Sequence, residues 1–74
     1  MRTAREQLNW AVARAMTLFD AGNHRGARMS FVSDVGNHPG TSWVMSDPVV
    51  WMAMEEGCAV GRQAFMKSMT DFNV

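Results

Sequence analysis

Two short segments of the chain repeat a pattern of residues that could bind a metal ion. The residues Asp-Ala-Gly-Asn-His at 20–24 return as Asp-Val-Gly-Asn-His at 34–38, an offset of 14 residues. Carboxylate and imidazole groups are ligands for zinc and similar ions. One candidate ligand set therefore comprises Asp20, His24, Asp34 and His38. The alternative is a repeated helix-stop signal, because glycine and asparagine tolerate the backbone of a helix end. No spacing here is diagnostic, and we predict neither a metal nor a cofactor.

Catalytic chemistry finds little support in the sequence. A nucleophile needs a neighbouring base held by a third group, and Cys58 stands alone within an apolar stripe. Glu55 and Glu56 are adjacent, so on a helix they point about 100° apart and do not converge as an acid and base pair. His24 and His38 could carry protons, but each stands at a turn without an obvious partner. We predict that the chain is not an enzyme.

The first element that positions these residues is a helix over about 4–21. Thr3 and Glu6 have the spacing of a capping box, in which each side chain accepts a hydrogen bond from the other residue's backbone N–H. Gly22 supplies the stop. Between these signals, apolar residues recur at the spacing of one helical face: Ala4, Leu8, Ala11, Val12, Ala15, Leu18 and Phe19.

A second clear helix is predicted over about 48–71. Asp47 is a good N-cap, and Pro48 suits the first helical position. Gly57 and Gly61 each cost about 1 kcal/mol relative to alanine inside a helix. We expect them to permit close approach of the first helix through Ala11 and Ala15. The alternative is that they mark a bend near residue 57.

The middle of the chain has two interpretations. Residues 24–35 form a helix if the apolar residues Ala27, Phe31, Val32 and Val35 point inward. Otherwise residues 28–33 pair with 41–46 in a β-hairpin, which gives an α-β-β-α order. We favour the helix, because an isolated two-stranded sheet is marginally stable.

The predicted fold is therefore all-α, a small three-helix domain spanning residues 1–74. Its helical hairpin is followed by a longer C-terminal helix, with a loop over 36–47. The expected core consists of Leu8, Val12, Leu18, Phe19, Phe31, Trp51, Met54 and Phe65.

Part of the chain resembles a single tetratricopeptide-type helical hairpin. That pattern has a small residue, a large apolar one, a turn glycine, an alanine, an aromatic and a closing proline. The matching residues here are Ala15, Leu18, Gly22, Ala27, Phe31 and Pro39. The chain departs from the pattern at Arg14 and Asp34, and no second repeat follows. The resemblance implies a helix-turn-helix hairpin used for binding protein.

Composition points to contact with another macromolecule. The 74 residues include eight methionines and three tryptophans but one cysteine, so no intramolecular disulfide can form. The single cysteine and the absence of an apolar N-terminal run favour a cytoplasmic location for the protein. No stretch reaches the length of a membrane span. A core this small has few interior places, and methionine and tryptophan are common at interfaces.

We therefore predict a protein-binding module, in which loop residues and an arginine face contact the partner. The predicted contact residues are Trp43, Met45, Arg25, Arg28 and Arg14. In style the chain resembles the short accessory proteins of bacteriophages and mobile elements. That resemblance implies a stoichiometric inhibitor or adaptor of a larger host or defence protein.

Two other classes stay open. Residues 1–28 carry a charge of +3, so their arginines could contact nucleic acid, although typical binders are more basic overall. Residues 29–61 carry −4, and a dipolar chain with a small core could also form a homodimer or a larger structural oligomer.

Overall fold

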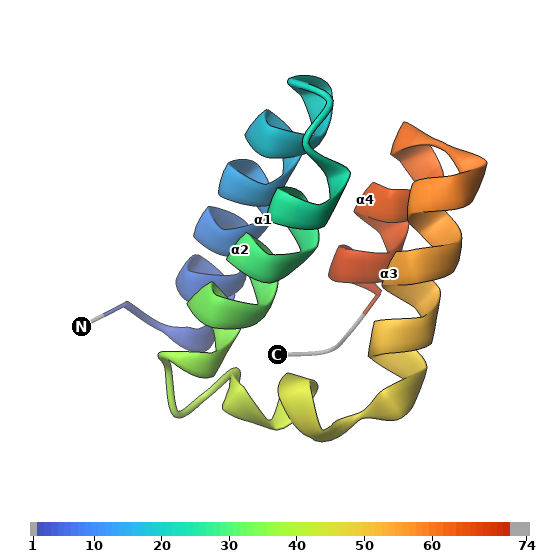
Figure 1. Ribbon diagram of the computed structural model, residues 1–74. Coiled ribbons are helices and arrows are strands. Elements are labelled where there is room, and N and C mark those ends of the chain that lie inside the picture. The colour runs from blue at the N-terminus through green and yellow to red at the C-terminus, as the bar shows by residue number, and fades with distance from the viewer. Residues whose placement is uncertain (1, 72–74) are drawn as a thin grey trace.

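Two helical hairpins lie side by side in the computed structural model, which describes residues 2–71 (Figure 1). Helices α1 (Ala4–Asp20) and α2 (His24–Gly36) form the first, and α3 (Pro48–Val60) and α4 (Arg62–Thr70) form the second. A short 3-10 helix, η1 (Ser42–Ser46), connects them. The all-α prediction is confirmed, with four α-helices in place of three over the described residues.

The ends of α1 follow the capping signals. The Thr3 hydroxyl accepts a hydrogen bond from the Glu6 N–H, and the Glu6 carboxylate accepts one from the Thr3 N–H. The hydrogen bond from the Thr3 backbone N–H is the main reason why the pKa of the Glu6 carboxyl lies below its usual value. Gly22 makes the turn with a φ of +87°, and the Asn23 side chain then caps α2. α2 follows directly from these local signals.

The predicted β-hairpin alternative is wrong. Residues 28–33 lie inside α2, and η1 occupies most of 41–46. The inward residues of α2 include Ala27, Phe31 and Val35, whose spacing fits a helix and not a strand.

The prediction of one long C-terminal helix is also wrong. Gly61 separates α3 from α4 with φ +150° and ψ −179°, a backbone conformation that side chains disfavour. Gly57 does provide a close approach, but to α4: a Cβ there would lie 2.8 Å from the Phe65 Cα. The expected packing of Ala11 and Ala15 against the two glycines is therefore replaced by a tight α3–α4 hairpin.

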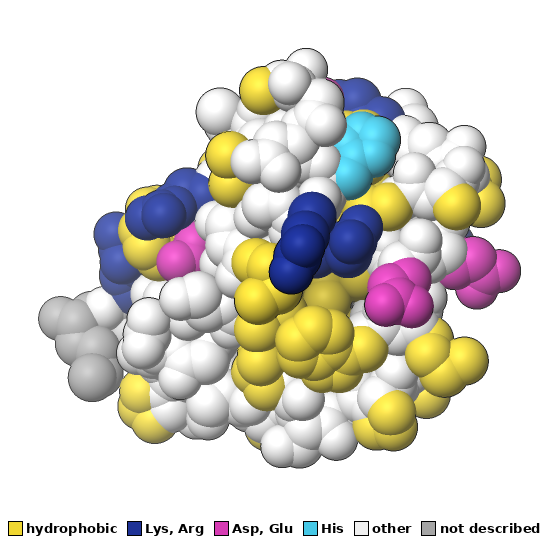
Figure 2. Space-filling view, viewed as in Figure 1, with side chains coloured by type: hydrophobic (Ala, Val, Ile, Leu, Met, Phe, Trp, Pro, Cys, Tyr) yellow, Lys and Arg dark blue, Asp and Glu magenta, His cyan; other side chains and the backbone are white. Residues whose placement is uncertain are grey.

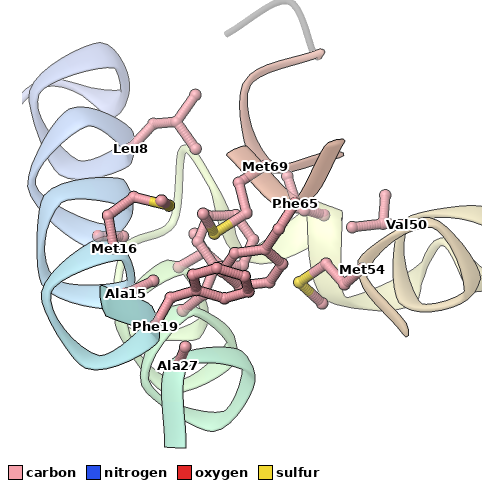
Figure 3. Packing of buried hydrophobic residues seen from close by; sticks show 13 residues of the cluster. Leu8, Ala15, Met16, Phe19, Ala27, Val50, Met54, Phe65 and Met69 are labelled. Carbon is pink, nitrogen blue, oxygen red and sulfur yellow. The ribbon is translucent and has the colours of Figure 1, made fainter. Parts of the chain in front are cut away.

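The core lies where the two hairpins meet (Figure 3). Phe65 of α4 is fully buried, and its ring stacks on Phe19 of α1 at a centroid distance of 4.9 Å. Of the predicted core, five residues are buried: Leu8, Phe19, Phe31, Met54 and Phe65. Val12, Leu18 and Trp51 are only half-buried against that cluster. Among the described residues, no helix is both long and apolar enough to cross a membrane.

Candidate functional site

The four residues of the repeated Asp/His pattern point to separate partners. Asp20 accepts two hydrogen bonds from Arg62, at 2.8 and 3.1 Å. His24 stacks on Phe19, and Asp34 pairs with Arg14 at 3.3 Å. Within residues 2–71, no group of three or more His, Cys, Asp and Glu side chains is placed to hold a metal. The pattern serves packing and helix connection.

His38 ties the start of the chain to the turn after α2. Its Nδ1 accepts a hydrogen bond from the Gly40 N–H at 2.8 Å. The Nε2 therefore carries the proton and donates to the Arg2 carbonyl. Because both ring nitrogens of this buried side chain are used, His38 is a structural residue.

Arg14 and Asp34, the departures from the tetratricopeptide-type pattern, pair with each other across the first hairpin. The Arg14 guanidinium also lies over the Trp10 ring, 4.7 Å from its centroid, and Arg2 lies over the same ring at 4.2 Å. The Asp34 side chain is 8% exposed. Arg14 is thus engaged within the fold, although its side chain stays half exposed.

Two of the predicted contact residues, Arg25 and Arg28, lie on one side of α2. Arg28, Val32 and Gly36 are four residues apart, so they form one strip along the helix. At the C-terminal end of this strip, the Met45 side chain of η1 lies against Gly36. A Cβ added to Gly36 would be 3.8 Å from the Met45 Cγ. Arg25 lies on the same side one turn earlier. The structure therefore places Arg25 and Arg28 on one side of α2, with Met45 at the C-terminal end of the helix.

Trp51 extends this surface toward α3. Its indole N–H donates to the Met45 carbonyl at 3.0 Å. We define the α2–η1 face as Arg25, Arg28, Val32, Met45 and Trp51. In Figure 2, basic side chains lie beside α2, and a hydrophobic patch below them reaches toward α3. The adjacent Met29 is 53% exposed.

Trp43 and Arg14 lie away from the α2–η1 face. Successive residues of a 3-10 helix are rotated by about 120°, so Trp43 and Met45 leave η1 on opposite sides of the buried Val44. The Trp43 indole donates to the Gly40 carbonyl, and the side chain is 46% exposed. Arg14 contacts Asp34, on the opposite flank of α2 from Arg28. The predicted site is therefore divided among three places.

Val32 and Trp51, which we expected in the interior, are half-buried at this face, and the exposed Met29 beside it was not predicted as a contact residue. The spacing of Arg25, Arg28 and Val32 on one helix could have indicated the first part of this face. The contribution of Trp51 could not be read in the same way, because it depends on how η1 turns the chain.

A second exposed apolar region lies on the outer side of α3. Val49 and Val60 are 68% and 74% exposed, and Met52 is 67% exposed. An open cleft of 330 Å³ runs between α3 and α4 here, and its lining includes Ala53, Gly57, Val60, Ala64 and Ser68. This region was not predicted as a site.

Comparisons with protein-family models, with curated proteins and with solved structures found no match to this chain.

Proposed function

We propose that this chain is a non-enzymatic protein-binding module that acts as a stoichiometric inhibitor or adaptor of a larger protein, in the manner of phage accessory proteins. The observation that carries the proposal is the α2–η1 face. It combines the exposed Arg25 and the half-buried Arg28 with half-buried apolar side chains, and the exposed Met29 lies next to Arg28 on α2. Arginine, methionine and tryptophan are enriched in protein interfaces.

The distribution of the large side chains supports this proposal. Met29 and Met52 are exposed, and Met45 and Met66 are half-buried. Trp43 is exposed, while Trp10 and Trp51 are half-buried. A chain that served only its own stability would gain by burying these groups, since each apolar Å² removed from water contributes about 25 cal/mol.

The residue types that could act in catalysis are not arranged for it, which favours a binding function. Glu55 and Glu56 are both exposed on α3, and Cys58 is half-buried against the core. None of them shares a hydrogen bond with a histidine among the described contacts. The expected absence of enzymatic activity therefore stays part of the proposal.

The experiment is a comparison of binding by wild type and by single variants. The tagged chain captures protein from a bacterial lysate, and the captured partner is purified and titrated against each variant. We expect Arg28→Glu to weaken the complex by at least about tenfold, as loss of an interface hot spot does. Arg5→Glu is the control, because it makes the same charge change at an exposed residue of α1.

Trp43→Ala tests whether the binding surface extends around η1. A large loss would place Trp43 in the contact, and a small one would confine the contact to the α2–η1 face. Unchanged binding by both Arg28→Glu and Trp43→Ala would refute the proposed surface. Light scattering on the complex gives its stoichiometry, and on the free chain it tests the homo-oligomer alternative.

Nucleic-acid binding is the second candidate, favoured by the Arg2–Trp10–Arg14 cluster. Arginine and tryptophan can contact phosphates and bases. Asp34 offsets the charge of Arg14, however, which weakens the field available to a phosphate. A gel shift with single- and double-stranded DNA and RNA tests this class. Tight, salt-sensitive binding that Arg2→Glu abolishes would rank it first.

A further inference from the structure

The outer side of the second hairpin carries a groove that α3 and α4 form together. The 330 Å³ cleft joins a smaller one of 160 Å³, because Ala53, Ser68 and Asp71 line both. Small side chains line much of its length, and Val49 and Val60 stand exposed toward its two ends. The 13 residues of α3 make the groove about 20 Å long, or between three and four helical turns.

Hydrogen bonding decides which backbone conformation a peptide would adopt if it bound in this groove. The walls are helices, whose backbone groups are bonded within each helix, so they offer no edge for a β-strand. An extended peptide would leave its own N–H and C=O groups unsatisfied against an apolar groove. A helix satisfies these groups internally and can lay one apolar face into the groove.

The charge of the groove selects the chemistry of that helix. Three carboxylates line it, from Asp47, Glu56 and Asp71, against the single ammonium of Lys67, so the net charge is −2. Neither Glu56 nor Lys67 forms an ion pair among the described residues. A helix with basic flanks would complement this charge, and a phosphate backbone would be repelled.

A second copy of the chain fits less well. Symmetric pairing would place the same surface on both sides of the interface, and each copy would bring a charge of −2 into one contact. Like charges facing each other in an interface cost binding free energy. Symmetric pairing of two grooves is therefore less favourable than binding of a basic helix from a different protein.

We propose that the α3–α4 groove binds an amphipathic helix of a partner protein, with an apolar stripe that faces Val49, Ala53 and Val60 and basic residues along its flanks. This inference rests on the proposed function and adds a second binding surface, distinct from the α2–η1 face. The two surfaces would allow one small chain to bridge two elements of a partner.

The test is a selection from a displayed library of helical peptides about 14 residues long, which matches the groove. The immobilised full chain is the target, and enriched peptides are synthesised and titrated by fluorescence anisotropy. We expect enriched sequences with apolar residues at positions i, i+4 and i+7 and with lysine or arginine beside them.

Variants then locate the bound peptide. Val60→Lys adds a positive charge at an exposed position, and we expect it to weaken binding by at least about tenfold. Ala13→Lys is the control, because it adds the same positive charge at an exposed position of α1, away from both proposed surfaces. We expect Glu56→Gln to weaken binding less and to reduce its dependence on salt. Circular dichroism confirms that each variant is folded.

Several results would overturn the inference. They are the absence of enrichment, enrichment of acidic peptides, or equal binding by wild type and Val60→Lys. A wild-type dimer that Val60→Lys disperses, measured by light scattering, would assign the groove to a second copy. Peptide binding that is lost in Arg28→Glu and kept in Val60→Lys would refute this inference and leave the proposed function standing.

Discussion

The two hairpins of this molecule are held together in different ways. Between α1 and α2, specific side-chain contacts cross the interface: the Gln7 amide donates to the Asp34 carbonyl at 2.6 Å, and Arg14 pairs with the Asp34 carboxylate. Between α3 and α4, the backbones approach closely because Gly57 has no side chain. The first interface depends on groups that are present, and the second on an atom that is absent.

This difference extends to the surfaces of the two hairpins. The first hairpin carries most of the arginines and hence a positive charge. Polar side chains form bonds across the interface between its two helices. The second hairpin exposes valines and a methionine. They lie beside a groove that is lined by small residues and by carboxylates. Each hairpin therefore offers a partner a different chemistry, and the core around Phe65 fixes their relative position.

The largest effect is expected from Phe65→Ala. Phe65 is fully buried and stacks on Phe19, so it joins the second hairpin to the first. Truncating a buried phenylalanine costs about 3–5 kcal/mol, which is close to the whole stability of a chain of this size. We expect the variant to lose its helical circular dichroism at 25 °C. Retention of about half of that signal would show instead that one hairpin folds alone.

Gly57→Ala tests the close approach in the second hairpin. The added Cβ would lie 2.8 Å from the Phe65 Cα and 2.9 Å from its nitrogen, and backbone atoms cannot rotate away. We expect a loss of about 2 kcal/mol in the free energy of unfolding, as for other overpacked sites, measured by urea titration.

The control is Gly36→Ala in the first hairpin. A Cβ there meets only the Met45 side chain at 3.8 Å, so we expect the gain in helix propensity to raise stability by up to about 1 kcal/mol. Equal effects of the two substitutions would remove the distinction between the hairpins.

The contrast between the hairpins also explains what the sequence could predict. The caps of α1 and α2 are local signals within a few residues of each other, such as Thr3 with Glu6, and both helices were predicted to within one residue of their observed ends. The second hairpin was missed because its turn needs a single glycine. The apolar spacing of Met54, Cys58, Phe65 and Met69 continues across Gly61 as if the helix did.

The candidate site was predictable only where its residues share one element. Arg25 and Arg28 were named together, and they do lie on one side of α2. Arg14 was grouped with them because all three are arginines, but it pairs with Asp34, 20 residues later in the chain. Trp43 and Met45 were grouped as loop residues, and the 3-10 geometry of η1 sends them apart. Such long-range and turn-dependent contacts carry no local sequence signal.

The two turn glycines allow a finer comparison. An added Cβ at Gly22 or at Gly61 would meet no atom within 4 Å, so only backbone strain distinguishes the substitutions. Alanine tolerates the φ of +87° at Gly22 better than the φ of +150° at Gly61, which is nearly glycine-only. We expect Gly61→Ala to cost about 2 kcal/mol and Gly22→Ala about 1 kcal/mol. Thermal unfolding followed by circular dichroism gives both values, and the reverse order would contradict this account.

The smallest effect concerns the ion pair that joins the hairpins, between Asp20 at the end of α1 and Arg62 at the start of α4. The Arg62 hydrogen bonds lower the pKa of the Asp20 carboxyl, and the same contact raises the pKa of Arg62. Both side chains are about half exposed, so solvent screens the pair. Its contribution should therefore be small.

Its dependence on pH has a definite sign. A carboxyl with a lowered pKa in the folded state stabilises above its unfolded pKa and loses that contribution as pH falls through the folded value. We expect Asp20→Asn to lower the urea midpoint slightly at neutral pH and to match wild type near about pH 2. Glu6, whose pKa is also lowered, titrates in both proteins, so the difference between them isolates Asp20. An equal midpoint difference at both pH values would show that the lost hydrogen-bond geometry, and not the charge, sets the contribution of this contact.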